Sequence, residues 1–264
     1  MFQVQLDTLP EGWQAAQQFH RLKHRLPRSL RNVVEERAID VILQRARTML
    51  RHAAQPTRTR RDQYPNDGDL DFDATLEAPR PWTAQDIVVE RREPRRADVV
   101  AILDMSLSMT GEKIALTALA TAILRLRLDR LSVYSFDTNA HPLVHLQEDV
   151  PVREVVRRIL RVPAQGYTNI EAGLRMSLDE LRTSPRSERA GVILTDGVAN
   201  VGRDPIPVAS RYPRLHVVQV GPEEPGGAKT CRAMARAGRG RRYRAPTYHD
   251  LPAVVRRLVR ECFR

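Results

Sequence analysis

The stretch "VVAILDMSLSMTGEK", residues 99–113, begins with five apolar residues and ends in a polar cluster that starts at Asp104. Residues 98–104 show almost no polar alternation, which is typical of a parallel strand covered on both faces. Over residues 111–128 apolar side chains recur at helical spacing, so a long helix is predicted there. The stretch therefore predicts a buried strand, a polar turn and a helix, which is the repeating unit of an α/β fold.

The chain after residue 85 continues in the same alternation. Further strands are predicted over 86–94, 131–136, 141–146, 190–196, 214–221 and 241–246, and further helices over 151–161, 169–182, 205–211, 227–237 and 248–262. Repeated strand–helix units of this length favour right-handed crossovers and helices on both faces of one sheet. We expect an α/β, doubly wound, mostly parallel sheet of the Rossmann-like kind.

The N-terminal third has a different character. Two helices are predicted over 12–26 and 29–52, separated by Pro27, and residues 53–85 are polar with four prolines and the acidic run "NDGDLDFDATLE". This segment is interpreted as a linker or draping loop; it fails as an EF-hand, because Gln63 and Pro65 would fall at ligand positions. We expect residues 1–85 to be a helical extension with an acidic linker and residues 86–264 to be the α/β domain.

Composition limits the classes of protein. The 264 residues are 42% hydrophobic, contain no run of ~20 apolar residues and begin without a signal-peptide pattern. We therefore expect a cytoplasmic protein with no membrane association. Cys231 and Cys262 lie in different predicted helices without CxxC spacing, so neither a zinc site nor a disulfide is expected.

The net charge of +11 first points to nucleic acid. However, 40 of the 43 basic residues are arginine, residues 62–202 carry a net charge of −5, and no basic motif is interleaved with aromatic residues. We interpret the charge as an arginine-rich solvated surface and do not expect nucleic acid as the main partner.

Three polar clusters fall at predicted strand ends or in the loops beside them. They contain Asp104, Ser106 and Ser108, then Thr168 in "QGYTNIEAG", then Asp196 in "LTDG". Open α/β sheets bind ligands beyond the carboxyl ends of their strands, where these segments can converge. Carboxylate and hydroxyl oxygens without histidine or cysteine are ligands for a small hard cation, so Mg²⁺ or Mn²⁺ is expected.

These clusters resemble the metal-ion-dependent adhesion site of von Willebrand factor type A (vWA) domains. That site has the pattern DxSxS, then a threonine in a loop, then an aspartate in a Thr-Asp-Gly turn, and all five positions are filled here. The resemblance covers about residues 96–262. It implies that Ser106, Ser108 and Thr168 offer hydroxyls to the ion, that Asp104 and Asp196 act through water or orient the hydroxyls, and that a partner's Asp or Glu completes the coordination.

The lead-in "GDLDFDATLEAP" and "DIVVERREPRRADVV" looks like that of bacterial intracellular members of this family. Those members include partners of MoxR-type AAA+ ATPases, metal chelatase D subunits and CoxE-like proteins. This likeness implies a protein–protein adaptor whose N-terminal helices dock the ATPase. The alternative is an RNA-associated protein that uses the basic ends, because the Ro ribonucleoprotein carries the same domain.

An enzyme is not expected. A phosphatase of the haloacid-dehalogenase type needs a second aspartate where Ser106 stands, and no GxSxG, GxxxxGK[ST] or strand-associated GxGxxG motif is present.

Tyr167 stands where, in the vWA domains that this sequence resembles, a second glycine often precedes the threonine. We expect Tyr167 to narrow access to the ion. Asp137 is left open between a residue that supports the site and a turn residue.

Two histidine pairs are interpreted as surface residues. His20 and His24 have the spacing of helical metal ligands, but the glutamate of an HExxH motif is missing and arginines surround them, so a solvated helix face is expected. His141 and His145 flank a predicted strand and are expected at the surface.

Overall fold

A computed structural model describes residues 12–51, 57–64, 66–77, 83–94, 96–247 and 249–262. The described residues fall into two compact units, the first within Met1–Ala53 and Ala97–Cys262 and the second within Ala54–Arg96. Compact units need not coincide with homologous domains, so the domain division expected between residues 85 and 86 stays a prediction.

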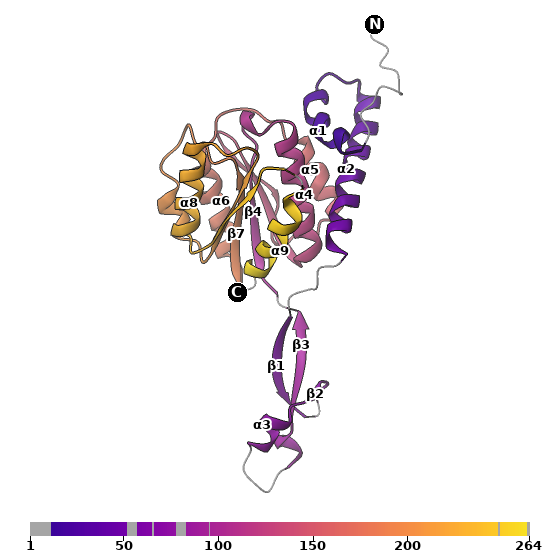
Figure 1. Ribbon diagram of the computed structural model, residues 1–264, viewed down its shortest axis with the longest axis vertical. Helices are drawn as coiled ribbons and strands as arrows, with labels where there is room; N and C mark the ends of the chain where they lie inside the picture. Colours follow the sequence, from indigo (N-terminus) through magenta and orange to yellow (C-terminus); the bar gives the residue numbers. More distant parts are fainter. Residues whose placement is uncertain are drawn as a thin grey trace. The chain divides into compact units, whose positions relative to one another are not determined.

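The first unit is built around a six-stranded sheet (Figure 1). Its strands in spatial order are β6 (Ala140–Val144), β5 (Arg130–Phe136), β4 (Asp98–Asp104), β7 (Arg189–Thr195), β8 (Leu215–Val220) and β9 (Arg242–Ala245). Only β6 runs antiparallel to its neighbour, and β4 is buried along its whole length. After β6, at one side of the sheet, the chain returns to β7 beside β4, so the two halves of the sheet meet between β4 and β7. This arrangement confirms the predicted doubly wound, mostly parallel fold.

Helices cover both faces of this sheet. They are α4 (Glu112–Arg127), α5 (Val152–Arg161), α6 (Ile170–Arg182), α7 (Ile206–Ala209), α8 (Pro225–Ala237) and α9 (Leu251–Cys262). Val100 and Ile102 of β4 face a buried cluster with residues of α6, α7 and α8, whereas α4 contacts α5 and α9 on the other side. None of the helices in the described residues has the length and apolarity needed to cross a bilayer.

Two N-terminal helices, α1 (Gly12–Leu22) and α2 (Arg28–Leu50), pack against α4 and α5. The Lys23 ammonium donates to the carbonyls of Leu160, Arg161 and Val162 at 2.9, 3.3 and 2.7 Å. These carbonyls lie at the C-terminal end of α5, where a helix leaves its acceptors without partners and favours positive charge. The guanidinium of Arg161 in turn donates two hydrogen bonds to Glu35 of α2. Polar contacts thus fasten the N-terminal helices to α5.

The solvated position expected for His20 is wrong. His20 is only 5% exposed, and its Nε2 lies 2.8 Å from the carbonyl oxygen of Val162. The reason is that the face of α1 that carries His20 packs toward the end of α5. His24, one turn later, is exposed as expected, and so are His141 and His145.

The linker or draping loop expected over residues 53–85 is wrong, because described residues of this segment form a small antiparallel sheet with β3. Strand β1 (Thr57–Gln63) pairs antiparallel with β3 (Val88–Pro94) over seven residues, and the short β2 (Asp69–Leu70) pairs with β3 as well. The acidic run, residues 66–77, therefore forms β2 and the whole of the short helix α3 (Phe72–Leu76), whose first turn is capped by Asp71. Backbone pairing orders this segment although its side chains are mostly polar.

Burial of His20 predicts an acid-dependent loss of stability. Burial lowers the pKa of this imidazole from 6.5 to about 4, so between these values the unfolded chain takes up a proton that the folded chain does not. His20→Gln keeps an N–H donor toward Val162 and removes the titration. We expect the free energy of unfolding, measured with urea, to fall less steeply from pH 6.5 to 4 in His20→Gln, by up to about 1 kcal/mol per pH unit.

The exposed His24→Gln variant is the matched control and should keep the wild-type slope. An equal loss of stability on acidification in His20→Gln and wild type would contradict the assignment.

Candidate functional site

The site forms where β4 and β7 end side by side. Asp104 is the last residue of β4 and is completely buried, and Thr195 ends β7 next to it. The hydroxyl of Thr195 donates to Asp104 Oδ2 at 2.5 Å. Asp196 follows directly, so the parallel register brings the two aspartates to one edge of the sheet.

The turn after β4 wraps around the other oxygen of Asp104. Ser106 donates to Oδ1 with both its backbone N–H, at 3.0 Å, and its hydroxyl, at 2.6 Å. The hydroxyl oxygens of Ser106 and Ser108 lie 3.2 Å apart. Ser106 is buried and Ser108 is exposed, so this row of oxygens leads from the buried carboxylate to the surface.

The loop that carries Thr168 is tied to the same edge from two sides. Gln165 donates its N–H to the carbonyl of Met105 at 3.2 Å, which joins the loop to the turn after β4. Thr168 donates its N–H to the Asn200 side chain at 2.6 Å and accepts from the Asn200 N–H at 3.2 Å, which joins it to the loop after β7. The structure thus gathers Thr168 with the segments that carry the other four predicted residues.

Lys113, on the first turn of α4, is a site residue that sequence reasoning missed. Its ammonium lies 2.8 Å from Asp196 Oδ2, while Asp196 Oδ1 accepts from the Val198 N–H. A Cβ on Gly221 would stand 2.6 Å from the Lys113 side chain, so the glycine leaves room for it. One feature of the sequence could have pointed to Lys113: lysine is rare in this chain, with only three among the 43 basic residues.

The electrostatics of the site favour a cation. Burial raises the pKa of Asp104 to about 6; hydrogen bonds from Ser106 and Thr195 oppose this rise and the nearby charge of Asp196 adds to it. A cation beside these carboxylates would lower the cost of keeping them ionised. The donor set of carboxylate and hydroxyl oxygens also fits Mg²⁺ or Mn²⁺. The described residues contain no group of three or more His, Cys, Asp or Glu placed to hold a metal, so the hydroxyls would have to contribute ligands.

Asp137 and Tyr167, the remaining residues of the prediction, have distinct positions. The Asp137 carboxylate accepts from the Asn139 N–H within its own turn, and its carbonyl accepts from the N–H of Asn169 at 2.8 Å. Asp137 is therefore a turn residue that also fixes the loop beside Thr168. The Tyr167 side chain is 62% exposed and directly precedes Thr168 in the chain.

Comparison with known proteins identifies the family of this chain. The family model of the VWA domain containing CoxE-like protein matches residues 43–209, which is more than half of the chain. A search of curated proteins gave no significant match.

Several solved structures share the fold at low sequence identity. BatB from Bacteroides thetaiotaomicron is 15% identical, with 63% of this chain and 98% of that chain covered at a TM-score of 0.53. A von Willebrand factor type A protein from Catenulispora acidiphila is 16% identical, with 81% and 51% covered at 0.55. Proximal thread matrix protein 1 from the mussel byssus, with a zinc-occupied MIDAS motif, is 19% identical, with 62% and 45% covered at 0.51.

The family match spans β4, the DxSxS turn, Thr168 and Asp196, which are the segments that form the site described above. The chain therefore belongs to the family of CoxE-like proteins that contain a VWA domain.

Proposed function

We propose that this protein is a cation-dependent protein-binding adaptor. The observation that carries the proposal is the buried Asp104 carboxylate, from which a row of hydroxyls leads to the protein surface. A buried carboxylate with a raised pKa beside a second aspartate is a place where an added cation is stabilised. The exposed Ser108 leaves the edge open to a partner.

The five candidate ligands divide into two roles in this proposal. Ser106, Ser108 and Thr168 would hold Mg²⁺ or Mn²⁺ through their hydroxyls, while Asp104 and Asp196 would orient those hydroxyls or act through water. When bound, the cation supplies a positive charge with a coordination position that a carboxylate from a partner protein can complete. Thr195 keeps Asp104 in place by donating to the oxygen that Ser106 does not use.

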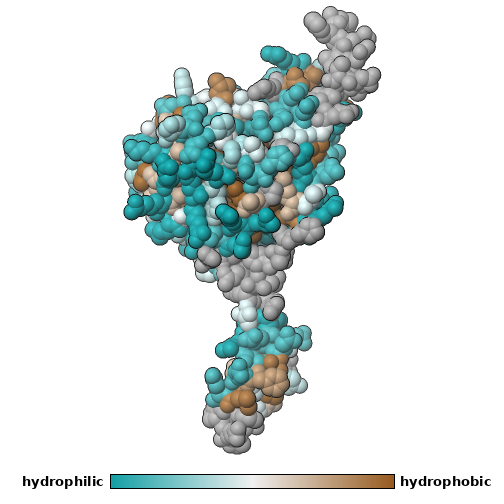
Figure 2. Space-filling model, viewed as in Figure 1, coloured by the Kyte–Doolittle hydropathy of each residue, from teal (hydrophilic) through white to brown (hydrophobic). Residues whose placement is uncertain are grey.

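Exposed apolar side chains near the site and on the second unit support a protein partner. Leu107, between the two serines, is 66% exposed, and Tyr167 precedes Thr168. In the second unit the exposed large apolar side chains are Tyr64, Leu70, Phe72 and Leu76, and Figure 2 shows apolar surface there. Apolar groups exposed in clusters are typical of interaction surfaces, and aromatic anchors are enriched in them.

Family membership supports a MoxR-type AAA+ ATPase as the partner. In this proposal the protein is a binding module and not an enzyme. In this proposal the faces of α1 and α2 that do not pack against α4 and α5 would dock the ATPase. The comparisons do not point to the RNA-associated alternative, which would show binding that weakens steeply with salt and does not respond to a chelator.

The metal site can be tested with paired serine variants. We expect calorimetric titration to show Mg²⁺ and Mn²⁺ binding to wild type and its loss in Ser106→Ala/Ser108→Ala, because two hydroxyl ligands are removed. The control is Ser187→Ala/Ser210→Ala. These two exposed serines precede β7 and β8, so they lie toward the amino ends of the strands, away from the site at the carboxyl ends. Equal binding by both double variants would contradict a site at the hydroxyl row. Binding by wild type should tighten when the cognate AAA+ ATPase is present.

Lys113 should weaken metal binding, because its ammonium competes with a divalent cation for Asp196. We expect Lys113→Gln to raise the affinity for Mg²⁺ on the order of fivefold, which is about 1 kcal/mol. Lys229→Gln makes the same charge change at an exposed position and should leave the affinity as in wild type. Weaker binding in Lys113→Gln would show instead that the lysine positions Asp196 for the ion.

A further inference from the structure

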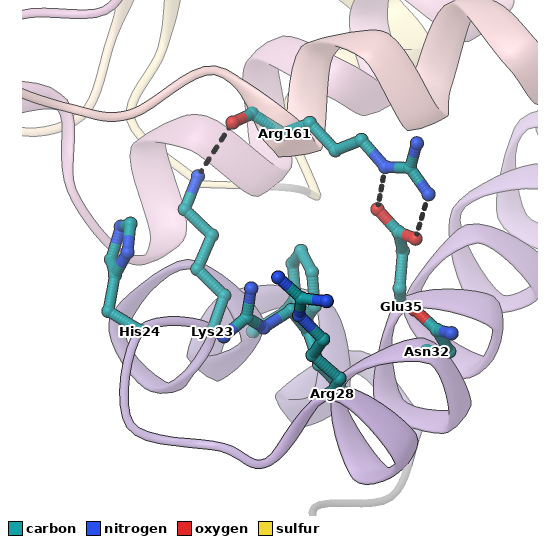
Figure 3. A pocket seen from close by; sticks show the side chains of 8 residues that line it. Lys23, His24, Arg28, Asn32, Glu35 and Arg161 are labelled. Atoms are coloured by element: carbon teal, nitrogen blue, oxygen red, sulfur yellow. Dashed lines mark hydrogen bonds and ion pairs between the residues drawn. The ribbon is translucent and has the colours of Figure 1, made fainter.

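A pocket separate from the strand-end site lies where the turn after α1, the start of α2 and the end of α5 meet (Figure 3). Its volume is about 320 Å³. It is lined by Phe19, Lys23, His24, Arg28, Arg31, Asn32, Glu35 and Arg161. This lining places four cationic side chains around one cavity with a single carboxylate.

That carboxylate is already used. Glu35 is only 5% exposed at its side chain and accepts two hydrogen bonds from Arg161, at 2.8 and 2.9 Å. Figure 3 shows Arg161 reaching across to Glu35, while Lys23 reaches to the main chain of α5 on the other side of the opening. The pair of Glu35 and Arg161 is neutral overall, so Arg161 offsets the charge of Glu35, and no second carboxylate lines the pocket.

Three cations of the pocket form no ion pair with a carboxylate in the described part of the chain, although the charge of Glu35 acts on Lys23. Lys23 is buried and donates only to main-chain carbonyls. Arg31 donates to the carbonyl of Leu26 at 3.2 Å, and its Nε–H is buried without an acceptor. Arg28 makes neither an ion pair nor a hydrogen bond with a described residue, and its side chain is exposed at the opening.

The start of α2 adds to this positive potential. Its N-cap, Pro27, makes no side-chain cap bond, and no acidic residue lies in the first turn. The positive end of the helix dipole is therefore not offset by a side chain there. A concave site with unpaired guanidinium groups and a buried ammonium is suited to an anion with several oxygens.

We propose that this pocket binds the phosphate group of a small phosphorylated molecule. Guanidinium groups donate in pairs to phosphate oxygens, and an ammonium adds a compact charge from a second direction. The volume is at the lower end of small-molecule pockets, so it holds a phosphate with part of the molecule that carries it. Burial lowers the pKa of Lys23 to about 8, and a bound anion would favour its charged form.

The position of the pocket gives the ligand a structural consequence. Its walls come from both N-terminal helices and from α5, so an anion held there would tie these helices more firmly to the vWA domain. A ligand that binds only the folded chain raises its unfolding temperature in proportion to the logarithm of the ligand concentration above the Kd.

The test uses the full chain in EDTA at low, constant ionic strength, with pyrophosphate, inorganic phosphate and malonate as probes in separate calorimetric titrations. We expect pyrophosphate and phosphate to bind wild type more tightly than malonate does, and pyrophosphate to raise the unfolding temperature. Arg28→Gln should weaken pyrophosphate binding at least tenfold. This variant should fold normally, because the Arg28 side chain is exposed and makes no hydrogen bond or ion pair with a described residue.

Arg37→Gln is the matched control, because Arg37 is an exposed arginine of the same helix that does not line the pocket. It should bind pyrophosphate like wild type. Absence of binding to wild type, or equal weakening in Arg28→Gln and Arg37→Gln, would overturn the proposal. Tighter binding of malonate than of phosphate would overturn it in favour of a carboxylate site. Because EDTA removes divalent cations, these results are independent of the proposed metal site.

Discussion

The buried carboxylate of Asp104 determines how the carboxyl edge of the sheet is built. A charge without access to water costs several kcal/mol unless donors surround it, and here Thr195 donates to one oxygen and Ser106 to the other. The first donor depends on the parallel register of β4 and β7, and the second on the turn after β4. Ser108 follows Ser106 in this turn, and Asp196 follows Thr195 at the end of β7. The positions of Ser108 and Asp196 are therefore set by the same turn and the same strand register.

The carbonyls at the C-terminal end of α5, which lack partners within the helix, explain how the N-terminal helices are held. Lys23 satisfies these carbonyls with one ammonium, and Arg161 binds Glu35 with a planar pair of donors. Lys113 likewise places a compact charge against Asp196. In a chain that otherwise uses arginine, two of the three lysines thus stand where a single point charge fits a confined space.

Local patterns in the sequence predict most of the first unit. The apolar run of β4, the helical spacing in α4 and the order of strands and helices all follow from side-chain periodicity. Asp104 and Asp196 lie at two neighbouring strand ends, and the loop that carries Thr168 is hydrogen-bonded to the segments that follow them. Periodicity fails for β1, because "TRTRRDQ" has no apolar face and its order comes from pairing with β3. It also misses the burial of His20 and the contact of Lys113 with Asp196, since each depends on a segment more than 80 residues away.

The proposed function requires that the row of hydroxyls beside Asp104 holds a divalent cation. The most direct measurement is a crystal structure of the full chain grown with Mn²⁺, with anomalous scattering used to locate the ion. We expect an anomalous peak within coordination distance of the hydroxyls of Ser106, Ser108 and Thr168, with the Lys113 ammonium moved away from Asp196. Mn²⁺ found only at other positions, with the contact between Lys113 and Asp196 intact, would contradict it.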